Sequence, residues 1–311
     1  MAKYMKTEQG YIDIPDFALA PFKPAGKSYL TFSSSNSFTL KVNNSTKKWD
    51  GTLEYFASDK TWTVWDGTTV LSAVYDDGEY FLYLRGTKNT IITGNNTSFR
   101  WILLGSNIAC IGNIENLLDY TIVASGNHPT MADYCYSSMF QGCTALTQAP
   151  ALPATTLADH CYQYMFYNCT SLTQAPALPA TTMAPGCYSS MFKGCTALIQ
   201  VPELPATMLA KRCYLSMFDS CTRLKLSTIQ TGEYTQEYRI PSSGTGATAS
   251  IALVDMFTST GGTFTGTPSI NTTYYLSTDN MIVRETEVAT LNGYVGSMID
   301  VAIGNAIGGS Y

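Results

Sequence analysis

The sequence LPATTLADHCYQYMFYNC occupies residues 152–169, and the similar sequence LPATTMAPGCYSSMFKGC follows 26 residues later, at 178–195. Related blocks bring the number of copies to four, between about residue 124 and residue 226. Two series of cysteines mark the period: Cys135, Cys161, Cys187 and Cys213, and Cys143, Cys169, Cys195 and Cys221. An internal period of this size is typical of repeats that stack and share one continuous core.

Each repeat is predicted to hold one short helix and one short strand. The helix would span residues 156–166 in the second copy, and its apolar face would consist of Leu157, Cys161, Met165 and Phe166. Asn168 and its glycine equivalents tolerate the positive φ at which such a helix stops. The next segment, C-T-x-L-x-x-x-P, is short and closed by proline, which favours a strand and an extended turn. This pattern predicts an α/β solenoid with 26-residue coils.

A fifth, degenerate copy follows an insertion. Residues 252–257 (ALVDMF) align with residues 213–218 (CYLSMF) at one period plus 13 residues, and Ala252 and Thr260 replace the two cysteines. The last unit of a stack must present a polar outer face, so an atypical copy predicts a cap. The inserted stretch is rich in Ser, Thr and Gly, which predicts a loop or hairpin.

The pattern L-P-x-T-x-L/M followed by F-x-x-C-x-x-L resembles the BspA-type (treponemal-type) leucine-rich repeat. The resemblance implies a leucine-rich-repeat fold. It also implies a surface or secreted binding protein, since members are adhesins of anaerobic bacteria and protists, and similar repeats occur in phages of gut bacteria. The 26-residue length and the Cys-Tyr pair before Met-Phe depart from the family's pattern.

The cysteines are interpreted as buried free thiols rather than as ligands or disulfides. Their spacing within a repeat is C-x7-C, whereas zinc sites usually use C-x(2–4)-C pairs, and the chain has only His128 and His160 as histidines. Residues eight apart in a helix lie about 12 Å apart, beyond the roughly 7 Å limit for a disulfide, so a disulfide would require a broken helix. The LPATT stretch lacks the glycine, apolar segment and basic tail of a sortase signal, and is interpreted as a turn before a helix N-cap. No metal or cofactor is predicted.

The region before the repeats predicts an antiparallel β-sandwich, and it also resembles a module that often precedes BspA-type repeats. Alternating stretches punctuated by Asp-Gly turns predict strands at 28–32, 37–42, 52–56, 61–65, 79–84 and 90–93. Trp62 or Trp65 could stack on a sugar, with burial in the sandwich as the alternative. Residues 106–123 would join the sandwich to the repeats and cover their first apolar end.

The C-terminal tail changes character to a 3–4 apolar spacing, which predicts a short helix after an extended segment. This helix is a candidate for oligomerisation or attachment, with packing onto the repeats as the alternative. Its apolar residues are Val288, Leu291, Val295, Met298, Ile299, Ala302 and Ile303. The predicted fold is therefore mixed and multi-domain: an extension (1–26), a β-sandwich (27–105), a leucine-rich-repeat-like solenoid (106–268), and an extended segment with an apolar helix (269–311).

Charge and motifs narrow the function classes. Eighteen basic and 23 acidic residues give a net charge of −5, without a basic cluster for binding nucleic acid. No window reaches the roughly 18 apolar residues of a membrane span. The N-terminus lacks the apolar run of a signal peptide, so we expect no export signal. No nucleotide-binding or hydrolase motif is present, and the chain is expected not to be an enzyme.

The predicted function is a binding or structural protein displayed on a phage virion, as a tail or head fibre component or receptor-binding protein. The expected partners are a host surface glycan or protein, other virion proteins and further copies of the chain. The alternative is an extracellular bacterial surface adhesin. Candidate ligand-binding residues form two columns at the period of the repeat, Gln148, Gln174 and Gln200, and Tyr136, Tyr162, Tyr188 and Tyr214. Both columns could instead serve contacts between coils.

Overall fold

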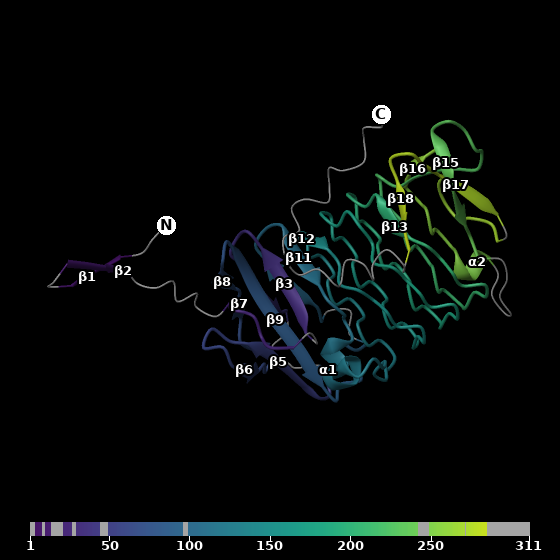
Figure 1. The fold of residues 1–311 in the computed structure, drawn as a ribbon. Coiled ribbons are helices and arrows are strands. Elements are labelled where there is room, and N and C mark those ends of the chain that lie inside the picture. Colours follow the sequence, from purple (N-terminus) through teal and green to yellow (C-terminus); the bar gives the residue numbers. More distant parts are fainter. Residues whose placement is uncertain are drawn as a thin grey trace, which may run out of the picture.

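The computed structural model describes residues 4–7, 10–13, 21–26, 29–43, 49–95, 99–241, 249–270 and 272–284. These residues form several small β-sheets joined by turns, and their helices are limited to α1 (Asn116–Ala124) and the four-residue α2 (Ala249–Ala252). Figure 1 shows the larger sheet at one end, the repeats beside it and a smaller group of strands at the far end. The predicted mixed fold with a leucine-rich-repeat-like α/β solenoid is therefore wrong. The predicted C-terminal helix lies outside the described residues.

The N-terminal region is built from short, mostly antiparallel strands. β1 (Tyr4–Thr7) pairs with β2 (Gly10–Asp13) as a separate hairpin. Two sheets follow, with the orders β10-β4-β7 and β12-β11-β3-β9-β5-β6, and β8 pairs with β9. The bounds of these strands are β3 (Leu30–Ser34), β4 (Thr39–Val42), β5 (Thr52–Phe56), β6 (Trp62–Val64), β7 (Leu71–Ser72), β8 (Val74–Asp76), β9 (Glu79–Thr87), β10 (Trp101–Leu104) and β11 (Ile108–Ile111).

One predicted hairpin turn forms as expected, and one predicted strand does not form. Asp77 and Gly78 connect β8 to β9 with φ values of 43° and 95°, as a two-residue hairpin turn requires. The Asp-Gly signal is thus confirmed at this position. Residues 90–93, predicted as a strand, form bends instead, because Ile92 and Thr93 both donate backbone N–H groups to the carbonyl of Cys135. This segment already lies against the first repeat.

The larger N-terminal sheet continues into the repeats without a break in its hydrogen bonding. β11 pairs antiparallel with β3 and parallel with β12 (Leu146–Gln148). Parallel bridges then join Gln148 to Gln174 and Gln174 to Gln200. Finally, β13 (Gln200–Pro202) pairs parallel with β18 (Met281–Val283). One buried apolar cluster likewise runs from Leu30 to Leu276, so the two regions share a core.

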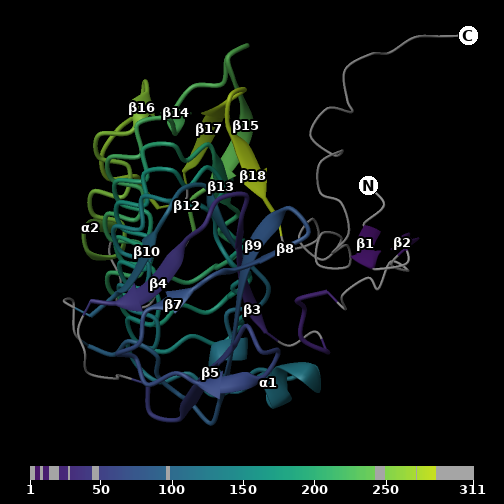
Figure 2. The same ribbon diagram turned by 90° about the vertical axis from the view of Figure 1, so that its left-hand side faces the viewer.

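Figure 2 shows the repeats stacked beside one another. Their backbone hydrogen bonds alternate regularly between bonds to the next repeat and bonds within a repeat. In the first repeat the N–H groups of Tyr136, Ser138 and Phe140 donate to carbonyls 25 residues later, on the neighbouring repeat, at 2.8–2.9 Å. The N–H groups of the residues between them, at 137, 139 and 141, donate to carbonyls three residues earlier, within the same repeat. Each backbone donor in the stretch is therefore satisfied, half of them by tight turns and half by the next repeat.

A left-handed residue at every fourth position prevents the predicted helix at 156–166. His160, Tyr164 and Asn168 have φ values of 55–57°, and equivalent residues in the other repeats share this conformation, including Tyr134, Ser138, Gly142, Gly186, Ser190, Gly194, Arg212, Ser216 and Ser220. A left-handed L-residue costs about 1–2 kcal/mol and cannot continue a right-handed helix. The spacing of four between the predicted helical-face residues reflects this run of turns rather than a helical period.

Identical side chains meet themselves along the stack. Phe140, Phe166, Phe192, Phe218 and Phe257 stack nearly parallel, with ring centroids 5.6–5.7 Å apart. At the N-terminal end Phe140 contacts Phe32 and Trp101 edge-on. At the other end Phe257 contacts the rings of Tyr238, Phe264 and Tyr274. The aromatic column is thus closed at both ends by neighbouring sheets.

The far end of the stack is covered by a four-stranded sheet with the order β15-β17-β14-β16. Tyr214 donates its N–H to the carbonyl of Ala252, as Tyr188 does to that of Cys213, so residues 252–257 continue the stack in the aligned register. The insertion contributes β15, whose Tyr238 hydroxyl donates to the carbonyl of Pro202 at 2.9 Å. The bounds are β14 (Lys225–Ser227), β15 (Tyr234–Arg239), β16 (Gly261–Gly262) and β17 (Thr273–Ser277).

Candidate functional site

The glutamine column lies on the surface of the repeats. Gln148 is exposed, and Gln174 and Gln200 are half-buried. The parallel bridges between them hold their Cα atoms in register, at the roughly 4.8 Å separation of paired strands. The column ends at Met281 in β18, whose sulfur lies 3.9 Å from Gln200 Nε2 and whose side chain is 56% exposed. The three amides therefore form a solvent-facing row.

The side-chain amides of Gln148 and Gln174 are not used to hold the repeats together. Within the part of the chain that the structure describes, neither side chain makes a hydrogen bond. An amide carries both donors and an acceptor and has no charge. Inter-repeat register is supplied by the backbone instead, as in the 2.8 Å bond from Ala175 N–H to the carbonyl of Gln200.

The tyrosine column, by contrast, is inside the molecule. Tyr136, Tyr162, Tyr188 and Tyr214 are at most 1% exposed, and their rings stack at 5.5–5.9 Å. Burial raises the pKa of each phenol well above its ordinary value, so all four remain neutral. These tyrosines face the interfaces between repeats and not a surface ligand, which is the alternative interpretation of this column.

The prediction of buried free thiols is confirmed. All nine cysteines are buried and unpaired. Those of the second series donate their thiols across the stack: Cys169 to Phe140 O and Cys195 to Phe166 O at 3.0 Å, and Cys221 to Phe192 O at 3.1 Å. Burial raises the pKa of Cys195 to about 12, which keeps the proton that this hydrogen bond needs.

The tryptophans of the N-terminal region do not offer a free face for sugar stacking. Trp65 is 1% exposed, and its indole N–H donates to the carbonyl of Thr69. Trp62 is half-buried, and the guanidinium of Arg85 lies 4.1 Å from its ring centroid. Arg85 is itself held by Glu54 at 2.8 Å, so the cation covers that face of the indole. The oligomerisation candidates between Val288 and Ile303 lie outside the described residues.

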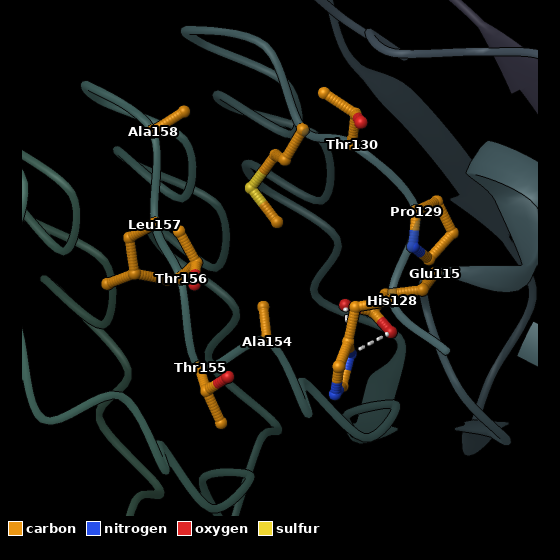
Figure 3. A pocket seen from close by; sticks show the side chains of 10 residues that line it. Glu115, His128, Pro129, Thr130, Ala154, Thr155, Thr156, Leu157 and Ala158 are labelled. Atoms are coloured by element: carbon orange, nitrogen blue, oxygen red, sulfur yellow. Dashed lines mark hydrogen bonds and ion pairs between the residues drawn. The ribbon is translucent and has the colours of Figure 1, made fainter. Parts of the chain in front are cut away.

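A pocket of about 310 Å³, which the sequence reasoning missed, opens between residues 128–131 and residues 154–158 (Figure 3). Its polar end holds Glu115, with a side chain only 1% exposed, and His128, whose side chain is 50% exposed. The imidazole Nδ1 lies 3.0 and 2.8 Å from the two carboxylate oxygens. Desolvation raises the pKa of Glu115 despite this hydrogen bond.

One sequence signal could have located this pocket. His128 stands one period before Ala154, and the same position is Ala180 and Ala206 in the later repeats. Those alanines are at most 3% exposed, because the position points into the stack. His128 at this position is instead half-exposed, with its imidazole against Glu115.

Metal binding, membrane spanning and similarity to known proteins could each provide a further functional assignment. Among the described residues no cluster of three or more His, Cys, Asp or Glu side chains is arranged to hold a metal ion. No helix in the described ranges has the length and apolar character to cross a membrane. Comparison with known proteins finds no matching family model and no curated protein or solved structure with significant similarity.

Proposed function

We propose that the protein is a non-enzymatic binding protein that recognises a host surface glycan or protein through the exposed side of its repeats. The observation that carries this proposal is the surface row of Gln148, Gln174 and Gln200, held in register by the backbone ladder. A rigid, repeated surface offers several equivalent contacts to one extended ligand, and linked contacts bind more tightly than each alone.

The chemistry of the row suits a glycan chain. Each amide both donates and accepts hydrogen bonds and carries no charge, which matches hydroxyl groups along a neutral polymer. The amides repeat at about 4.8 Å, so consecutive amides can contact the same sugar residue or adjacent ones.

Display on a phage virion is the proposed setting, because the repeat sequence resembles BspA-type proteins, which include proteins of phages of gut bacteria. In this setting residues 285–311 would attach the chain to other virion proteins or to further copies of itself. A bacterial surface adhesin would use the same binding surface. Mass spectrometry of purified particles separates the two: the chain should be found in the virion, and its presence only in the host envelope would favour the adhesin.

Binding is tested with a glycan array. The full chain should bind at least one host-derived glycan, and alanine at Gln148, Gln174 and Gln200 together should abolish that binding. An array without signal, or equal binding by the triple variant, would overturn the assignment of this surface. The attachment role is tested by the mass in solution with and without residues 285–311; an unchanged monomer mass would contradict self-association.

A further inference from the structure

We propose that the pocket beside the first repeat binds one pyranose ring, with His128 accepting a hydrogen bond from one of its hydroxyl groups and the buried Glu115 holding the imidazole in place. The pocket is a discrete site next to the glutamine row, and the choice of a sugar as ligand class rests on the glycan recognition proposed above. Figure 3 shows the two chain segments that form its walls, with Glu115 and His128 together at one end.

The pocket lies where the stack is open, between residues 128–131 and residues 154–158. The equivalent place in the later repeats is closed. At the equivalent corner of the later repeats, Thr182 pairs with Met208 as a parallel bridge. Met183 and Leu209 are at most 9% exposed there, whereas their equivalents Met131 and Leu157 are only half-buried and line the pocket. The first corner thus leaves a cavity of about 310 Å³ beside apolar side chains.

The polar end of the pocket presents acceptors. A carboxylate only accepts, so the 2.8 Å contact places a proton on His128 Nδ1 and leaves Nε2 as an acceptor in the neutral ring. The Glu115 side chain is only 1% exposed, so it orients the imidazole and leaves the contact with a ligand to His128. The residues that line the pocket include no lysine or arginine. A ligand for this end must therefore donate hydrogen bonds.

A pyranose ring matches both ends of the pocket. One of its hydroxyls supplies the donor for His128 Nε2, and its C–H face can pack on Pro129, Met131 and Leu157. The hydroxyls of the exposed Thr155 and Thr156 add contacts at the rim. Small-ligand pockets typically enclose about 300–1,000 Å³, so this one holds a single ring. An ammonium ion would leave the apolar wall without a partner.

The test is saturation-transfer NMR on the full chain with the methyl glycosides of glucose, galactose, mannose and N-acetylglucosamine. At least one glycoside should receive saturation and shift the His128 ring signals. Glu115→Gln keeps the shape and an acceptor for Nδ1 but loses the charge, and should weaken binding by about tenfold or more. Glu203→Gln, at a 54% exposed carboxylate away from the pocket, is the matched control and should bind as the wild type does.

No saturation of any glycoside, or equal binding by Glu115→Gln, would overturn the pocket assignment. A His128 shift with methylammonium and not with the glycosides would overturn it in favour of a cation. The Gln148/Gln174/Gln200 triple alanine variant should retain the monosaccharide signal while losing glycan binding. Failure of the glutamine row and failure of the pocket are therefore distinguishable.

Discussion

The tyrosine and glutamine columns have the same 26-residue period but opposite environments. Tyr136, Tyr162, Tyr188 and Tyr214 are at most 1% exposed and stack ring on ring, whereas the glutamines reach solvent. A period states which residues align between repeats. It does not state which way each aligned position points, because that depends on the backbone within one repeat. The difference separates a column that stabilises the stack from a column that reaches solvent.

The largest expected effect is on the buried column. Tyr188→Ala removes a ring that stacks between Tyr162 and Tyr214, and loss of a buried aromatic costs about 3–5 kcal/mol of unfolding free energy. Urea unfolding measures this change. Gln174→Ala, at the surface of the preceding repeat, should change the unfolding free energy by no more than about 0.5 kcal/mol. Equal losses in the two variants would contradict the assigned sides.

A second prediction uses the pH dependence of the buried thiols. Cys195 has a folded-state pKa of about 12, above the roughly 8.5 of a free thiol. A raised folded pKa gives stability that is fully present below pH 8.5 and is lost as the pH rises toward 12.

At pH 10 the raised pKa of this one thiol should lower the unfolding free energy by about 2 kcal/mol relative to pH 7. The difference in unfolding free energy between the wild type and Cys195→Ala should therefore be smaller at pH 10 than at pH 7 by that amount. A constant difference would indicate a thiol that ionises normally. Alkylation of the native protein at pH 8 should also be slow at all nine buried cysteines until urea unfolds the chain.

A smaller effect distinguishes two members of the tyrosine column. The hydroxyl of Tyr136 donates to the carbonyl of Ile114 at 3.3 Å, while that of Tyr162 is buried without a partner among the described residues. Tyr136→Phe should therefore lower the unfolding free energy by about 0.5–1.5 kcal/mol, whereas Tyr162→Phe should leave it unchanged or raise it. Thermal or urea unfolding of both variants checks the difference; an equal cost would show that Tyr162 has a partner too.

Several individual strands and turns follow from residue identity and spacing, whereas the predicted overall fold is wrong, and the departures have specific physical causes. Strands β5 and β9 begin where alternation predicts them, at Thr52 and Glu79, and the Asp77-Gly78 turn lies between strands as expected. The prediction of a helix at 156–166 is wrong because a spacing of four residues and a helical period of 3.6 residues are alike over so short a stretch. The left-handed residues that distinguish them are often Ser, Tyr or His, which carry no glycine signal.

The candidate site was predictable only in part. The glutamine row could be listed from the period alone, but its exposure depends on bridges between repeats. The pocket is harder to anticipate, since Glu115 precedes the repeats and its contact with His128 depends on the three-dimensional fold. The sequence signal for the pocket is His128, which stands where the later repeats have alanine.

The most direct test of the account compares two exposed columns of the same stack. One variant carries alanine at Gln148, Gln174 and Gln200, and the matched control carries alanine at Thr144, Thr170 and Thr196, which are also exposed once per repeat. Titration of a glycan that binds the wild type should show binding lost in the glutamine variant and retained in the threonine variant, with both unfolding as the wild type does. Retained binding in the glutamine variant, or equal loss in both, would contradict the account.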